Sequence, residues 1–218
     1  MREPDSARAV ARYRRLAKDY DHATRRAAPV RARAVAALGL RAGQTVLDVA
    51  CGTGVCFPLL EEQVGPSGRI IGVELSPDML ALARRRVENA CWTNVTLIQA
   101  SMETVTLPIR WDAALFHYTQ DVLRSGVALA NIFAQAKDGA HVAAAGTKLF
   151  PWWLAPLNVY VRLANRNYVT TFDGLRRPWT LLQRDYLPDL RVEPVWLGAS
   201  YIASGRYRGS CASAERNG

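Results

Sequence analysis

Five short apolar segments alternate with helical segments, and this alternation constrains the fold more than any other feature of the chain. The apolar segments span residues 45–50, 69–75, 94–100, 111–118 and 141–147. Strands that are apolar along their whole length belong to parallel sheets with helices over both faces. The pattern therefore predicts an α/β fold with a mostly parallel sheet.

The helical segments and the C-terminal part complete this prediction. Helices are expected at residues 6–20, 29–38, 55–64, from Ser76 onward, at about 122–136 and near 174–187. Residues 151–170 are aromatic and irregular. Residues 190–198 and 200–207 are predicted to be two strands that meet at Gly198. They bring the total to seven strands, with an antiparallel hairpin at the end of the sheet.

The positive charge is concentrated near the N-terminus. The chain has 218 residues and a net charge of +9. Residues 1–41 hold eleven basic and four acidic side chains, a balance of +7, which leaves +2 for the remainder. The basic segment can be a solvated helix face or can meet anionic lipid, nucleic acid or an acidic substrate. Because the body is nearly neutral, no nucleic-acid partner is expected. Residues 84–86, three arginines, are expected on a solvated face.

The four cysteines and the apolar runs indicate a cytoplasmic protein. The cysteines are too few and too scattered for a disulfide framework or a zinc site, so no metal is expected. They suit a reducing compartment. No apolar run approaches the roughly 20 residues of a membrane-spanning helix, and no secretory signal is visible at the N-terminus.

The first strand carries an acid and ends in a glycine loop. Asp48 lies within the apolar strand, and Gly52 and Gly54 follow it. In open α/β sheets, ligands bind outside the carboxyl ends of the strands, where glycines allow close approach to the backbone. Glu74 ends the second strand, where a carboxylate can accept both hydroxyls of a ribose. Phe57 replaces the third glycine of a dinucleotide fingerprint, which disfavours a nicotinamide cofactor.

Three segments, VLDVACGTG, GVELSPDML and IQASMETVTLP, resemble class I S-adenosylmethionine-dependent methyltransferases. Among these, the small-molecule enzymes of ubiquinone and menaquinone biosynthesis are the most similar. The resemblance covers about residues 9–150. It implies a Rossmann-like sheet, S-adenosylmethionine as cofactor, and methyl transfer to a small-molecule acceptor by in-line displacement. The acceptor and the attacked atom stay open.

The resemblance also implies roles for single residues. The loop around the methionine part of the cofactor corresponds to Asp48, Ala50, Cys51, Gly52 and Gly54. Glu74 corresponds to the ribose acid, Leu75 to the residue that flanks adenine, and Ser101 and Met102 to the adenine edge. Tyr20 belongs to a Tyr-Asp pair on an N-terminal helix that closes over the cofactor, and His117 falls beside the transferable methyl. Two departures stand out: Ala50 replaces a glycine, which is acceptable in an ordinary β conformation, and Ser101 replaces an aspartate.

Two groups of side chains are candidates for the reacting end. His117 and Tyr118 end the fourth strand and are the candidate catalytic residues. His117 can be a general base or can only line the cofactor, and the sequence does not decide between these. The candidate acceptor-binding residues are Trp152, Trp153, Asn158, Tyr160 and Tyr168. Their aromatic rings can stack on a planar acceptor or can simply cover the core.

Taken together, these patterns predict one methyltransferase domain over residues 1–218. It would comprise a basic helical lid (1–40), a cofactor-binding core (41–150) and an acceptor-pocket segment with the closing hairpin (151–218). Three alternatives stay open. The chain can be a phospholipid methyltransferase whose basic N-terminal helix makes a weak contact with the membrane surface. It can cyclise or cleave S-adenosylmethionine without methylating anything, or it can be a non-enzymatic nucleotide-binding module. The oligomeric state is open too.

Overall fold

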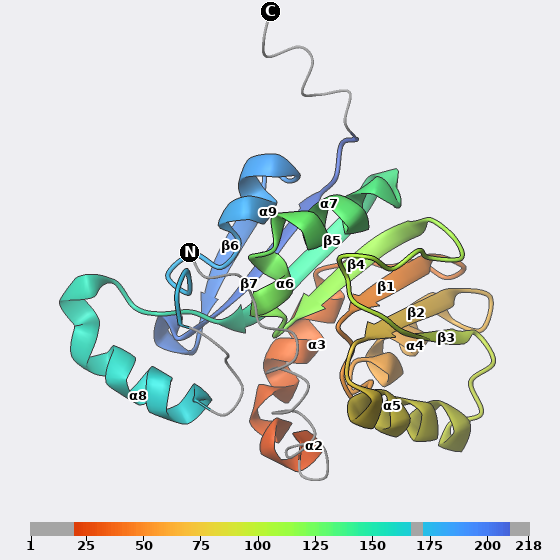
Figure 1. Ribbon diagram of the computed structural model, residues 1–218, viewed down its shortest axis with the longest axis horizontal. Coiled ribbons are helices and arrows are strands. Elements are labelled where there is room, and N and C mark those ends of the chain that lie inside the picture. The colour runs from red at the N-terminus through yellow and green to blue at the C-terminus, as the bar shows by residue number, and fades with distance from the viewer. Residues whose placement is uncertain (1–19, 167–171, 210–218) are drawn as a thin grey trace, which may run out of the picture.

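The computed structural model describes residues 20–166 and 172–209, and Figure 1 shows a twisted sheet with helices on both faces. The sheet has seven strands in the order β3-β2-β1-β4-β5-β7-β6. β1 to β5 pair in parallel, and β7 is antiparallel to both β5 and β6. The strands are β1 (Thr45–Val49), β2 (Arg69–Glu74), β3 (Val95–Gln99), β4 (Trp111–His117), β5 (Ala136–Thr147), β6 (Arg191–Val195) and β7 (Ser200–Arg206). The predicted mixed sheet with its antiparallel hairpin is confirmed.

The helices form two layers around the sheet. They are α2 (Tyr20–Ala23), α3 (Ala28–Ala36), α4 (Phe57–Val64), α5 (Pro77–Asn89), α6 (Gln120–Leu123), α7 (Gly126–Ala134), α8 (Ala155–Asn165) and α9 (Thr180–Asp185). Short 3-10 turns are η2 (Arg25–Ala27), η3 (Trp152–Leu154) and η4 (Trp196–Gly198). The helix predicted at 6–20 lies outside the described residues except for Tyr20. None of the described helices is long and apolar enough to cross a membrane.

Alternate residues of the strands build two separate cores. On one face, Val46 and Ile70 pack with side chains of α3, α4 and α5. On the other face, Leu47 and Ile71 pack with side chains of α7 and α9. Because successive strand side chains point to opposite faces, each strand contributes to both cores. This explains why the strands are apolar along their whole length.

Several predicted elements differ from the structure, and the helix expected near 174–187 is only the short α9 over Thr180–Asp185. The helix expected at 122–136 is two helices, because the Ser125 side chain accepts a hydrogen bond from the Ala128 N–H and caps α7. β5 begins at Ala136, which pairs with Trp111, rather than at residue 141. Residues 155–165, expected to be irregular, form α8, with Pro156 in its first turn, where proline is tolerated.

Candidate active site

Three titratable side chains converge at the carboxyl ends of neighbouring strands. Glu74 ends β2, Asp48 lies near the end of β1, and His117 ends β4. Asp48 pairs with Gly72 and Leu115, so Glu74 and His117 each lie two residues further along their strands. The three positions therefore share one face of the sheet, the face that α3 and α4 cover.

Glu74 organises the loop after β1. Its carboxylate accepts hydrogen bonds from the N–H of Gly52 at 2.9 Å and from the N–H of Ser76 at 2.7 Å. Burial raises the pKa of this carboxyl, and these backbone donors counteract the shift. Gly52 has a φ of +59°, and a Cβ added there would meet no atom within 4 Å. The loop thus leaves open space beside a buried carboxylate.

Asp48 is a buried acid with an unsatisfied oxygen. Its side chain is 1% exposed, and its Oδ2 has no hydrogen-bond partner among the described residues. Burial, together with the nearby Glu74 charge, raises the pKa of Asp48 to about 8. Such an oxygen is a candidate contact for a bound ligand or an ordered water.

Ala50, which stands where the resembled motif has a glycine, does not adopt the ordinary β conformation that would make an alanine acceptable there. Its φ is +51°, in the left-handed region that a side chain disfavours. The chain must turn sharply there as it leaves β1 for the loop. The condition under which an alanine is acceptable here is therefore not met, and the loop holds local strain at Ala50.

Arg31 is the residue that the sequence analysis missed. It lies on α3, is only 9% exposed, and its Nε has no partner among the described residues. Its charge partly counteracts the rise in the pKa of Asp48 and contributes to the lowered pKa of His117. Arg31 shares the spacing of the buried Ala34 and Val35 on the inner face of the helix. The sequence signal that could have identified Arg31 is an arginine at the spacing of the apolar residues that α3 buries.

His117 and Tyr118 differ in their surroundings. The Nε2 of His117 is buried without a partner among the described residues. Burial and the Arg31 charge lower the pKa of His117 to about 3, so its imidazole is neutral. The Tyr118 hydroxyl lies 3.3 Å from Ser200 Oγ, which in turn donates to the Gly146 carbonyl. Burial raises the pKa of Tyr118, so it is a neutral phenol.

The N-terminal Tyr-Asp pair lies against the glycine loop. Asp21 accepts a hydrogen bond from the Thr53 hydroxyl at 2.5 Å and forms an ion pair with Arg86. The Nε of Arg86 also donates to the Thr53 carbonyl at 3.0 Å. This clamp fastens α2 to the loop, and the half-buried Tyr20 directly precedes Asp21 in the chain. The prediction of a solvated face is therefore wrong for Arg86, although Arg84 and Arg85 are exposed.

The remaining predicted cofactor residues lie around this edge. Leu75 is half-buried directly after β2. The Ser101 hydroxyl accepts from the Glu103 N–H at 3.2 Å and shapes the turn after β3. Met102 and Cys51 are each 6% exposed and belong to the two opposite cores. Their contacts with a cofactor stay predictions.

The predicted acceptor-binding residues do not gather around the glycine loop. The side chains of Trp152, Trp153 and Tyr160 are exposed on η3 and α8. Asn158 bridges the backbone N–H and carbonyl of Phe150 at 2.8 and 3.1 Å, which is a structural role. Tyr168 lies outside the described residues. Their part in acceptor binding stays a prediction.

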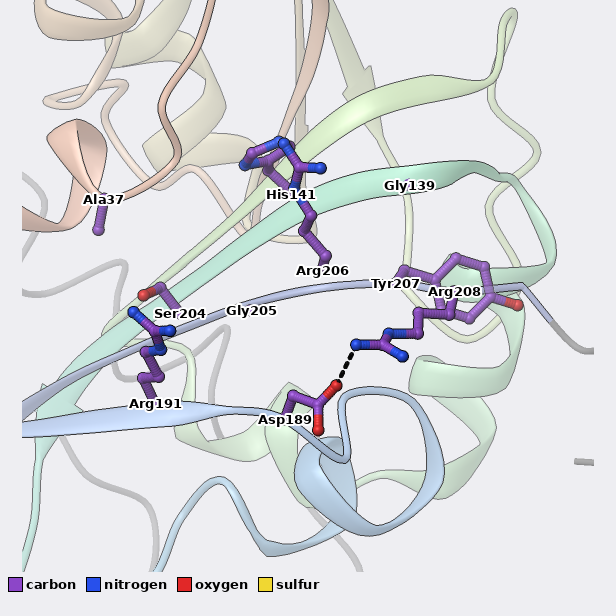
Figure 2. Close-up of a pocket in the computed structure, with 10 residues that line it drawn as sticks. All are labelled: Ala37, Gly139, His141, Asp189, Arg191, Ser204, Gly205, Arg206, Tyr207 and Arg208. Carbon is purple, nitrogen blue, oxygen red and sulfur yellow. Dashed lines mark ion pairs between the residues drawn. The ribbon is translucent and has the colours of Figure 1, made fainter. Parts of the chain in front are cut away.

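A basic pocket of about 670 Å³ lies on another part of the sheet (Figure 2). Arg191, Arg206 and Arg208 line it with His141, and Arg208 is paired with Asp189 at 2.5 Å. None of the predicted cofactor residues contributes to its lining. Within residues 20–166 and 172–209, no group of three or more His, Cys, Asp or Glu side chains could hold a metal ion.

The residues at the strand ends fit a nucleoside-type cofactor. A buried carboxylate can accept hydroxyl groups, the open space beside Gly52 admits a ligand to the backbone, and the orphaned Asp48 oxygen and Arg31 nitrogen offer one acceptor and one cation. A hydrogen-bond acceptor and a cation are therefore both available for a zwitterionic group.

Part of the chain matches known proteins in sequence. Residues 46–139 match a family described as a methyltransferase domain. A demethylmenaquinone methyltransferase of Shouchella clausii is 38% identical over 81 residues, which cover 37% of this chain and 33% of that protein. One of Lactococcus lactis is 32% identical over 119 residues, covering 51% of this chain and 45% of that protein. The matches thus span less than half of these relatives.

The fold is also that of solved enzymes. The structure of an S-adenosylmethionine-dependent methyltransferase from Aquifex aeolicus superposes with a TM-score of 0.54 at 19% identity, over 78% of this chain and 85% of that one. The family match and the curated relatives confirm the resemblance read from the sequence motifs, and the superposition confirms the predicted fold.

Proposed function

We propose that this chain, whose residues 46–139 match a family described as a methyltransferase domain, is a class I enzyme that transfers a methyl group from S-adenosylmethionine to a small-molecule acceptor. The observation that carries the proposal is the buried Glu74 carboxylate, hydrogen-bonded to Gly52 beside open space at the carboxyl ends of the strands. That is where open α/β sheets bind nucleosides.

Several residues would hold the cofactor. Glu74 would accept the ribose hydroxyls, and the backbone around Gly52 would lie against the methionine part. Arg31, a buried guanidinium near that loop, would pair with the methionine carboxylate, while Asp48 would accept a hydrogen bond from the amino group. The clamp of Asp21, Thr53 and Arg86 would keep α2 over the bound molecule.

The chain's own residues contribute positioning rather than strong base catalysis. When bound, S-adenosylmethionine supplies a methyl group on a positively charged sulfur that an acceptor atom can displace in line. His117 is neutral with a pKa of about 3 and is therefore a weak base. It can accept a hydrogen bond from an acceptor hydroxyl and orient it. Alignment of the two reactants can supply much of the rate.

The names of the two curated relatives favour one class of acceptor. The two named above are demethylmenaquinone methyltransferases, which favours a small aromatic quinol as acceptor. The nearly neutral body of the chain gives no support for a nucleic-acid substrate. Cys51, Cys56 and Cys91 are free thiols, which suits action in the reducing cytoplasm.

Calorimetric titration with S-adenosylhomocysteine tests the proposal. Glu74→Ala should weaken binding about 100-fold or more, because two charge-assisted hydrogen bonds are each worth about 1.5–3 kcal/mol. Glu88→Ala, which alters an exposed glutamate of α5, is the matched control and should bind like the wild type. Equal affinity of the Glu74 variant would overturn the ribose assignment.

The product distinguishes methyl transfer from the other uses of the cofactor. Incubation with a demethylated menaquinol should yield S-adenosylhomocysteine and a methylated acceptor in equal amounts. Release of methylthioadenosine without an acceptor would instead show that the enzyme cyclises or cleaves S-adenosylmethionine.

A further inference from the structure

The segment that follows β5 is an exposed apolar arm. We define the aromatic arm as residues 151–166, which contain η3 and α8. Figure 1 shows α8 standing away from the sheet and from the other helices. The largest exposed side chains of the arm are Trp152 (70%), Trp153 (65%), Tyr160 (73%) and Leu163 (59%). Few soluble surfaces carry so many large apolar side chains in one short segment.

The apolar side chains of α8 form a stripe on its outer face. Val161 is 3% exposed and packs with Leu149, Phe150 and Leu175, so it marks the inner face. Pro156, Val159, Tyr160 and Leu163 recur at intervals of three, four and seven residues, which places them together on the opposite face. A surface helix normally turns its apolar side inward. Here the outer face is the more apolar one, and no described residue covers it.

The charged side chains within the arm have one sign. Residues 139–172 contain no Asp or Glu, whereas Lys148, Arg162 and Arg166 are all basic. The guanidinium of Arg162 lies 5.2 Å from the centre of the Phe172 ring, which holds it beside the arm. Exposed tryptophan and tyrosine rings next to arginines suit the headgroup boundary of an anionic bilayer.

A second apolar tip lies at the same end of the sheet. Trp196 and Leu197, in η4, are 47% and 100% exposed. The neighbouring Gly198 lies against Phe150: a Cβ added there would be 3.4 Å from its ring. Phe150 is the residue that Asn158 of the arm holds by its backbone. The tip and the root of the arm are therefore adjacent.

We propose that the aromatic arm docks on the surface of a lipid bilayer that contains anionic headgroups. Trp152, Trp153, Tyr160 and Leu163 enter the boundary between headgroups and acyl chains, and Arg162 and Arg166 stay at headgroup level. A second copy of this chain is disfavoured as the occupant, because two arms in contact would bring their like charges together. The docking does not depend on the methyltransferase activity proposed above.

Vesicle co-sedimentation of the purified chain, without cofactor, tests this docking. The vesicles are phosphatidylcholine alone or phosphatidylcholine mixed with phosphatidylglycerol. The wild type should sediment more strongly with the mixed vesicles. A variant with Trp152→Ser, Trp153→Ser, Tyr160→Ser and Leu163→Ser should lose about 100-fold or more of its partition coefficient, since it removes four large apolar side chains.

Two further variants separate the contributions. Arg162→Gln with Arg166→Gln should reduce partition into the mixed vesicles about fivefold for each charge removed. Val127→Ser with Ile109→Ser removes exposed apolar side chains elsewhere (65% and 38% exposed) and should bind like the wild type. Circular dichroism of each variant checks that the fold is intact.

The outcomes are distinct. Absence of sedimentation with either vesicle, or equal binding of the four-site variant, would overturn the proposal. Analytical ultracentrifugation gives a further test. If the wild type is a dimer, the four-site variant is a monomer and neither binds vesicles, the arm binds a second copy of the chain and the proposal is overturned.

Discussion

Asp48→Asn is the substitution whose effect on stability the structure specifies most directly. Asp48 is 1% exposed, and its pKa is raised from 3.8 to about 8, chiefly by burial. The folded chain therefore holds a proton on this carboxyl that the unfolded chain has already released between these two pH values. The contribution of Asp48 to stability must therefore fall as pH rises from about 4 to about 8 and stay level above that.

The magnitude follows from the two pKa values. At 1.36 kcal/mol per pH unit, the distance from 3.8 to about 8 corresponds to about 6 kcal/mol at pH 8 and above. Relaxation around a buried group makes this an upper bound. An asparagine has nearly the same shape and no charge to bury. The variant should therefore be more stable than the wild type at pH 8, by several kcal/mol, and close to it near pH 4.

Urea unfolding followed by circular dichroism between pH 4 and 9 measures this difference. Subtracting the two curves cancels the other titrating groups, and the agreement expected near pH 4 serves as the internal control. If the two proteins show the same dependence of unfolding free energy on pH from 4 to 8, Asp48 does not carry a buried proton and the argument fails.

Three further substitutions probe the neighbouring residues. Ala50→Gly should raise the free energy of unfolding by about 1 kcal/mol, because it relieves a left-handed alanine; a loss of stability in a urea titration would contradict this. Arg86→Gln weakens the clamp on Asp21, so amide hydrogens of α2 should exchange about two- to fivefold faster, as expected for a partly exposed ion pair; unchanged exchange would show that the clamp does not hold α2. His117→Ala should change turnover at saturating substrates by less than about tenfold, whereas a loss of 100-fold or more would identify a general base.

The sequence predicts the sheet well for a physical reason. Strands such as β1 and β2 are buried on both faces, so their continuous apolar runs leave few alternatives. Ser76 marks the start of α5 correctly, because its hydroxyl accepts from the Met79 N–H. Glu74 is also recognisable, since an acid at the end of such a strand needs a partner.

The missed features depend on tertiary contacts. α8 turns its apolar stripe outward, so the usual expectation of an inward-facing stripe does not identify it. In the sequence, Arg31 is one of many arginines near the N-terminus, and only the packing of α3 shows that it is buried. The strained φ of Ala50 follows from the sharp turn of the loop. An alanine in the sequence does not indicate a left-handed backbone conformation. That Asp48 and His117 share a face with Glu74 emerges only from the register of three strands.

A crystal structure of the chain with S-adenosylhomocysteine tests the central claim most directly. The ligand should lie at the carboxyl ends of β1 and β2, with both ribose hydroxyls about 2.5–3.0 Å from the Glu74 carboxylate oxygens and the methionine part against residues 50–54. A ligand bound in the basic pocket of His141 and Arg206, or a ribose that does not touch Glu74, would contradict the claim.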